Sequence, residues 1–297
     1  MVQIVIDSVI RGCALAVLAA AVTLVYGLAR FANIAQVELA TVAAYVTFGV
    51  GTLGLALVPA ALVGVACAAA LAVLSYVVLF RRMLADSTAK AMIASLALGI
   101  VIRAALQFVA GPEPRRLNLP LEQALDVRGA LVTPSQMRAT VTGLAVLALL
   151  LAVLRWTPLG RSIRAVAINR DLASAAGIAS TRVTAVVWAL AGMLSGLGGV
   201  MLAVTSDVGI QLGYATLLPV FAAAILGGLG SPGGAIVAAF GLSLVEGVVL
   251  DVDWGKLVGS TEWLVPTPYR PAIGFVALVI VLVVRPQGLF GRDARRA

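Results

Sequence analysis

The sequence predicts an all-α protein, a polytopic transmembrane helical bundle of about eight or nine membrane segments, some of them short or re-entrant. Of its 297 residues, 62% are hydrophobic and only 11% are charged, and the mean hydropathy is +1.09. Soluble domains carry about 25% charged residues. Two stretches, Gly12–Ala29 and Val183–Val204, contain no charged residue. Because these runs are continuous and not alternating, helices rather than β-barrel strands are expected to span the bilayer.

The apolar segments, taken in order along the chain, give the expected membrane helices. They lie near 9–29, 33–51, 55–80, 90–110, 138–155, 183–204, 216–229, 232–250 and 271–285. The second segment and the two that flank a glycine-rich loop are short against the about 20 residues that a span needs, so they could be non-spanning or re-entrant. We expect the whole chain, 1–297, to form a single transmembrane domain. The first segment predicts a retained helix, because Asp7 precedes it and no leading basic cluster does.

The absence of histidine and the isolation of the two cysteines argue against several classes of function. It has no histidine, the commonest metal ligand and general base. Its two cysteines, Cys13 and Cys67, lie within apolar runs and are predicted to be packing residues, which disfavours a disulfide framework or a metal site. The basic residues are spread over loops, which favours membrane topology over nucleic-acid binding. Neither a paired-aspartate motif nor a nucleophile elbow is present, so we predict no catalytic residues and no metal ligands.

The distribution of basic residues predicts which loops face the cytoplasm. The loops near 30, 81–90, 155–182 and 285–297 hold 13 of the 21 Arg and Lys residues. Short cytoplasmic loops are enriched in these residues. We therefore expect a multi-pass protein of the bacterial inner membrane with its N-terminus outside and its C-terminus in the cytoplasm.

Residues 222–241, AAAILGGLGSPGGAIVAAFG, form an apolar stretch interrupted by glycine and proline. A phosphate-binding P-loop would need a Gly-Lys-Ser/Thr ending, and no Lys or Arg follows this loop closely, so no nucleotide site is predicted. The loop is either a plain turn or a helix break that contributes to a substrate path or a hinge. The candidate path residues here are Gly227, Gly228, Gly230, Ser231 and Pro232.

Three ionisable residues fall within apolar runs: Glu38, Arg103 and Glu246. A charge in hydrocarbon costs several kcal/mol, so each is expected to face protein or water. With the second segment beginning near the membrane surface, Glu38 and Arg103 would differ in depth by about 12 Å, which argues against a direct pair. We predict that Glu38, with Asn33 and Gln36, lines the substrate path.

Residues 157–182 form a long loop that carries Arg161, Arg164, Arg170 and Arg182 against a single acidic residue, Asp171. Apolar residues at three- and four-residue spacing predict a short amphipathic helix in it. Asn169 or Asp171 could cap a second helical turn that Gly177 would end. The helix could lie on anionic lipid through its arginines, or it could dock on a partner protein.

The span 183–204 contains the small residues Gly192, Ser195, Gly196 and Gly199 at four-residue spacing. Such spacing lets helix backbones approach closely in lipid. We favour tight packing inside one subunit over a dimer interface.

Four stretches resemble, in the same order, regions of bacterial branched-chain amino acid permeases, the smaller of the two membrane subunits of those ABC importers. They are TLVYGLARFANIAQVELATVAAYV, GRSIRAVAINRDLASAAGIASTRVTAVVWALAGMLSGLGGVML, ILGGLGSPGGAIVAAFGLSLVEGV and the closing YRPAIGFVALVIVLVVRPQGLFGR. Where that family has an Asn-Phe-Ala-His-Gly-Glu run, Asn33, Ala35 and Glu38 remain, Gln36 replaces the histidine and Val37 replaces the glycine.

The resemblance implies an ABC permease subunit for branched-chain amino acids or related small polar solutes such as amides or urea. It implies no cofactor in this chain, ATP hydrolysis by cytoplasmic ATPase subunits, a second homologous permease subunit and an extracytoplasmic solute-binding protein. It also implies that residues 155–182 form a coupling loop on the ATPase. The coupling residues would be Arg161, Arg164, Asp171, Ala173, Ala176, Gly177 and Ile178. The alternative is a self-sufficient secondary transporter that uses the intramembrane Glu and Arg residues.

Overall fold

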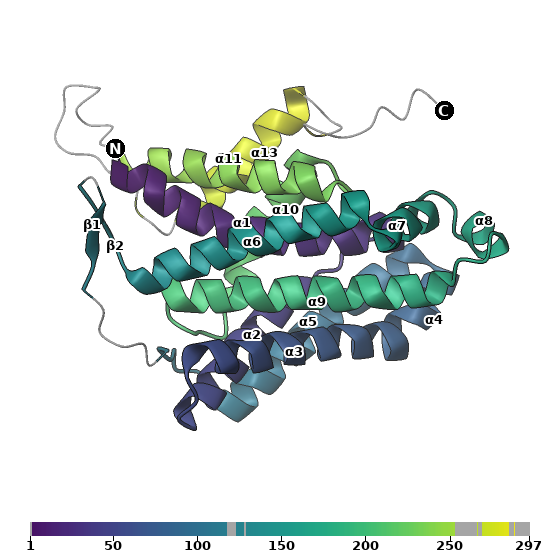
Figure 1. Ribbon diagram of the computed structural model, residues 1–297, viewed down its shortest axis with the longest axis horizontal. Helices are drawn as coiled ribbons and strands as arrows, with labels where there is room; N and C mark the ends of the chain where they lie inside the picture. The colour runs from purple at the N-terminus through teal and green to yellow at the C-terminus, as the bar shows by residue number, and fades with distance from the viewer. Residues whose placement is uncertain are drawn as a thin grey trace.

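The computed structural model describes residues 2–117, 123–127, 129–252, 266, 269–284 and 288, which form a helical bundle (Figure 1). Its elements, in chain order, are α1 (Val2–Ala29), α2 (Ala35–Thr52), α3 (Leu57–Ser75), the π-helical turn η1 (Tyr76–Phe80), α4 (Arg81–Asp86), α5 (Thr88–Ala110), β1 (Leu125–Val127), β2 (Ala130–Val132), α6 (Pro134–Trp156), α7 (Pro158–Ile168), α8 (Arg170–Ala175), α9 (Ser180–Thr205), α10 (Leu212–Gly227), α11 (Pro232–Asp251) and α13 (Arg270–Val284).

Each predicted apolar segment corresponds to one helix or to one continuous run of helices, which confirms the predicted fold class. Within the described part of the chain, six helices are long and apolar enough to cross a membrane. Two of the three segments that were expected to be short are short, since α2 has 18 residues and α10 has 16, whereas α11 has 20 residues and is long enough to span a membrane. The third helix continues through η1 and α4, several residues beyond the predicted end at 80. The predicted cytoplasmic C-terminus, 285–297, lies outside the described residues apart from Gly288.

A small antiparallel hairpin, β1 with β2, was not anticipated from the sequence. It pairs Leu125 with Val132 and lies beside the start of α1, at the end of the bundle opposite α7 and α8 (Figure 1). Thr133 follows it and caps α6 in a capping box with Gln136, with Pro134 in the first turn. The hairpin therefore leads the chain directly into a well-capped membrane helix.

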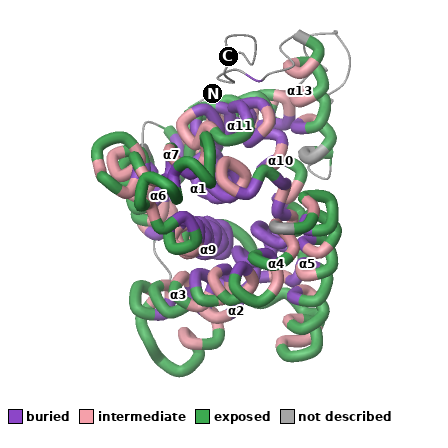
Figure 2. The backbone as a smooth tube through the Cα atoms, turned by 90° about the vertical axis from the view of Figure 1, so that its right-hand side faces the viewer, coloured by how far each residue is buried: buried purple, intermediate pink, exposed green. Residues whose placement is uncertain are grey.

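The core lies between α1, α9 and α11. These helices are buried along much of their length, whereas α3, α5 and α6 expose apolar faces outward (Figure 2). Exposed apolar side chains such as Ile93, Val101 and Leu149 are suited to contact with lipid tails.

Small residues on α9 are packed against other helices of the same chain. A Cβ on Gly192 would lie 2.6 Å from the Ala72 Cβ of α3, and a Cβ on Gly198 would lie 2.7 Å from Leu18 of α1. Gly196 likewise approaches the Cα of Val65 on α3. These contacts confirm the expected role of the α9 glycines in packing within one subunit.

We expect Gly192→Val to destabilise the protein by about 1–3 kcal/mol, because its side chain would overlap the backbone and the alanines of α3. The control is Gly241→Val on α11, where a Cβ meets nothing within 4 Å. The thermal unfolding midpoint of each variant, measured in the same detergent, checks the prediction. Equal midpoints for the two variants would contradict the close α3–α9 packing.

Candidate functional site

The chain between α1 and α2 is irregular and buried. Phe31 and Asn33 are 2% and 3% exposed, although they lie outside any helix. The Ile34 backbone N–H donates to the Ser95 hydroxyl at 3.2 Å, and that hydroxyl also contacts the Ala32 carbonyl at 3.5 Å. Because Ser95 lies two turns inside α5, α2 begins within the bundle and not at its surface. Irregular backbone at membrane depth is tolerated only where protein or a watery cavity surrounds it.

Two of the predicted path residues form a buried polar chain at this break. The Asn33 amide donates to Gln36 Oε1 at 3.2 Å, and Gln36 Nε2 donates to the Ser195 hydroxyl of α9 at 2.8 Å. All three side chains are at least 97% buried. Ser195 was considered in the sequence only as a packing residue, and its hydrogen bond could not be inferred because the two residues are 159 positions apart.

Glu38 and Arg103 form an ion pair, so the expectation that their difference in depth argues against a direct pair was wrong. That prediction placed the start of the second segment at the membrane surface, whereas α2 begins beside the middle of α5. Gly99 of α5 faces Ala35 and the Glu38 side chain, which brings Arg103, one turn further on, to the level of Glu38. The Glu38 carboxyl is 1% exposed.

Arg103 has a second partner, which sequence analysis did not identify. Its guanidinium lies 4.1 Å from the ring centroid of Tyr214 on α10. Tyr214 is half exposed, so the ion pair lies one side chain away from the surface of this chain. A cation–π contact of this kind contributes about 0.5–2 kcal/mol. The charged pair thus joins α2, α5 and α10.

The glycine-rich loop separates two helices, an arrangement that is compatible with both interpretations of the sequence, a plain turn and a functional helix break. α10 ends at Gly227 and α11 restarts at Pro232, with the Ser231 hydroxyl accepting from the Gly234 N–H. Gly228 and Gly230 have φ angles of 94° and 90°, a conformation that residues with a Cβ resist. The break therefore depends on its glycine residues.

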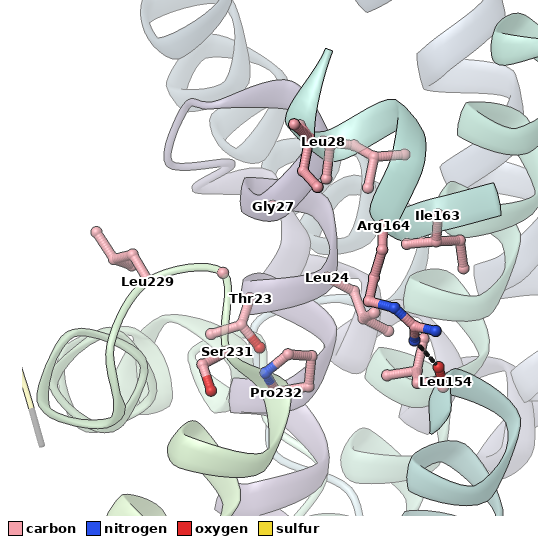
Figure 3. Close-up of a pocket in the computed structure, with 13 residues that line it drawn as sticks. Thr23, Leu24, Gly27, Leu28, Leu154, Ile163, Arg164, Leu229, Ser231 and Pro232 are labelled. Carbon is pink, nitrogen blue, oxygen red and sulfur yellow. Dashed lines mark hydrogen bonds between the residues drawn. The ribbon is translucent and has the colours of Figure 1, made fainter. Parts of the chain in front are cut away.

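A cavity of about 430 Å³ joins this break to the loop that follows α6 (Figure 3). Its walls come from the last two turns of α1, the end of α6, α7 and residues 229–232. The Arg164 side chain of α7 borders it and donates to the Leu154 carbonyl of α6. Gly27 of α1 and Gly230 face each other there, since a Cβ on Gly27 would lie 3.7 Å from the Gly230 Cα. Two regions that the sequence analysis treated separately thus meet at one site.

The predicted amphipathic helix is α7, and the predicted second turn is α8. Ile163 and Val166 of α7 are buried, and the Asn169 side chain caps α8 by accepting from two backbone N–H groups. Gly177 ends this turn with a φ of 83°. These features confirm the local structure expected for residues 157–182.

The coupling residues divide between the surface and the interior. Arg161, Asp171, Ala176 and Gly177 are exposed and Ile178 is half-buried. Ala173, in contrast, is 4% exposed and packs within this chain, so it does not lie on the surface that was expected to face an ATPase.

The Arg30 side chain connects α7 to the buried segment between α1 and α2. The Arg30 guanidinium donates to the Ala167 carbonyl at 2.9 Å, and Arg30 itself has a left-handed φ of 56°. Residues other than glycine seldom adopt a left-handed backbone, so the contacts around Arg30 must stabilise this conformation. Arg30 is three residues from Asn33, so α7 is connected to the polar chain through a short backbone segment.

Comparison of the sequence with known proteins identifies the family of the chain. The sequence profile described as branched-chain amino acid transport system / permease component matches residues 4–283. The chain is 28% identical to the high-affinity branched-chain amino acid transport system permease protein LivH of Escherichia coli K12, over 96% of this chain and 94% of the relative. It is 25% identical to the corresponding protein BraD of Pseudomonas aeruginosa, over 98% of this chain and 95% of the relative.

A solved structure shares the fold. PsaBC from Streptococcus pneumoniae in complex with Fab superposes with a TM-score of 0.50 at 15% identity, over 97% of this chain and 93% of that chain. The sequence profile covers almost the whole chain, including the buried break and the glycine break, and the chain belongs to the family of branched-chain amino acid transport system permease components.

Proposed function

We propose that this chain is the permease subunit of an ATP-driven ABC importer for branched-chain amino acids or related small polar solutes. Its partners would be a second homologous permease, cytoplasmic ATPase subunits and an extracytoplasmic solute-binding protein. The chain forms a single transmembrane domain, and residues 155–182 contact the ATPase at the cytoplasmic end. The relatives are components of branched-chain amino acid transport systems, and this supports the substrate class.

The observation that carries the proposal is the cavity between α7 and the glycine break, together with the hydrogen bond that joins α7 to the break between α1 and α2. A partner that moves α7 would act on the glycine break through the shared cavity wall and on residues 30–34 through the Arg30–Ala167 hydrogen bond. Both breaks have irregular backbone, which changes conformation at lower cost than a helix interior. Movement there would shift Asn33, Gln36 and Glu38, which we propose as path residues.

The alternative is a secondary transporter driven by an ion gradient. Such transporters use intramembrane ionisable groups. Here Glu38 pairs with Arg103, and Glu246 pairs with Arg11 at 3.3 Å. A carboxylate held by a guanidinium is neutralised without a bound ion, which favours the ATP-driven proposal.

Uptake of labelled leucine and urea into membrane vesicles tests the proposal. The vesicles should contain the chain with the ATPase, second permease and binding protein of its system. We expect leucine uptake that requires ATP and persists when ionophores collapse the ion gradients. Uptake that is lost with ionophores and is independent of ATP would support the secondary transporter.

The glycine break is predicted to be a moving part. In Gly230→Val, a β-branched residue would have to adopt a φ of 90°, at a cost of about 1–3 kcal/mol. We expect leucine uptake to fall by about tenfold or more. The control is Ala148→Val on the exposed face of α6, which should transport normally. Wild-type uptake by Gly230→Val at normal membrane levels would make the break a passive turn.

A further inference from the structure

A second cavity, of about 390 Å³, lies at the other end of the bundle. It is bordered by the first turns of α1, the start of α6 and the ends of α9 and α11. Residues 7–11 of α1 line it, whereas residues 23–28 line the first cavity, so the two are about 24 Å apart along α1. Figure 1 shows the start of α1 at the end of the bundle opposite α7 and α8.

Charged side chains give this cavity an unusual lining for a membrane protein. Asp7, Glu246 and Asp251 contribute three carboxylates, and Arg11 contributes one guanidinium. Glu246 is 1% exposed and lies 3.3 Å from Arg11. The described lining therefore has an excess of negative charge. Asp7 and Asp251 are exposed, whereas Glu246 is buried and paired with Arg11, so the attraction for a cationic group is that of charges near a protein surface, which is stronger than in bulk water.

A buried hydroxyl at this cavity has no partner in the described part of the chain. Ser8 is 4% exposed, lines the cavity and has a hydroxyl oxygen without a hydrogen bond. Its neighbour Ser243 is satisfied, because that hydroxyl donates to the Ser8 carbonyl at 2.9 Å. A buried polar atom without a partner is costly, and a ligand that hydrogen-bonds to it would remove that cost.

We propose that this cavity binds the charged head of an α-amino acid, with the ammonium near Asp7 and Asp251 and the carboxylate near Arg11. The proposal rests on the proposed transport function, and it assigns the ligand to the ammonium-bearing solutes rather than to urea or amides. The Ser8 hydroxyl would accept from the ammonium, and Ile10 and Leu202 in the lining would contact an aliphatic side chain. On the topology expected from the sequence, the cavity opens at the extracytoplasmic end, where solute is delivered.

Direct binding tests the site. The full-length chain, in nanodiscs of phosphatidylglycerol, should retain labelled leucine. Isoamylamine, which keeps the ammonium, should compete, and 4-methylpentanoate, which keeps only the carboxylate, should compete poorly. Asp251→Asn should weaken leucine binding by about tenfold, the effect expected for one charged contact. The matched control is Asp86→Asn, an exposed carboxylate on α4 outside the cavity lining, which should bind leucine normally.

Two outcomes would overturn the assignment. Equal leucine affinity in Asp251→Asn and the wild type would place the ligand elsewhere. Leucine binding that disappears in nanodiscs of phosphatidylethanolamine would identify the ammonium of a lipid headgroup as the occupant. Uptake by the complete transporter, measured in parallel, separates the two proposals: normal uptake without binding here contradicts only this site, whereas absent uptake contradicts the proposed function.

Discussion

Replacing Glu38 by alanine will greatly reduce leucine uptake and will destabilise the chain. The Arg103 guanidinium of α5 would lose its carboxylate partner and, among the contacts of the described residues, would keep the one with the ring of Tyr214. Removing one member of a buried ion pair costs about 3–5 kcal/mol, because the other charge stays behind. The thermal unfolding midpoint and the uptake rate of the same preparation measure the two effects. Glu38→Gln, which keeps the shape, separates charge from packing.

A double-mutant cycle tests whether the effect arises from the pair. Glu38→Ala combined with Arg103→Ala should recover part of the stability that Glu38→Ala loses, since no unpaired charge remains. The matched control is the exposed pair of Asp86 with Lys90, whose removal should cost well below about 1 kcal/mol. Normal uptake by a Glu38→Gln variant that assembles normally would show that no charge is required at this position.

The sequence was sufficient for features that depend on local chemistry. Hydropathy located the membrane helices, because a bilayer demands long apolar runs. Glycine and proline located the break between α10 and α11, since these residues stop and restart helices wherever they occur. Asn169, one of the two candidate caps, and Gly177 located the ends of α8 because their local chemistry starts and stops helices.

The ion pair could not be predicted, because its geometry depends on contacts between distant segments. Nothing in the sequence of residues 30–34 shows that they form irregular backbone held inside the bundle by Ser95. If α2 is assumed to begin at the membrane surface, the position of Glu38 along α2 places it at a different depth from Arg103. The local sequence around Tyr214 does not indicate its contact with Arg103 either. That contact requires α10 to pack beside α2, where the Gly213 N–H donates to the Thr41 hydroxyl.

Gly177→Trp is expected to uncouple ATP hydrolysis from transport. Gly177 is exposed, has a φ of 83°, and a Cβ there would meet nothing within 4 Å, so a side chain would project from the bundle without disturbing its core. If α8 and its glycine seat in a groove of the ATPase, the indole would hold α7 away from it. We expect uptake to fall by at least about tenfold while ATPase activity and binding of the solute-binding protein persist.

Backbone strain must be separated from loss of docking, since tryptophan at a positive φ is itself unfavourable. Gly54, between α2 and α3, provides the control: it has a φ of 90°, is exposed, and a Cβ there also meets nothing within 4 Å. Gly54→Trp carries the same strain and bulk on a different loop, so it should transport normally. Gly177→Asn, which tolerates a left-handed backbone, should retain most uptake. Normal uptake and ATPase association in Gly177→Trp would instead place α7 and α8 on the lipid surface, held there by their arginines.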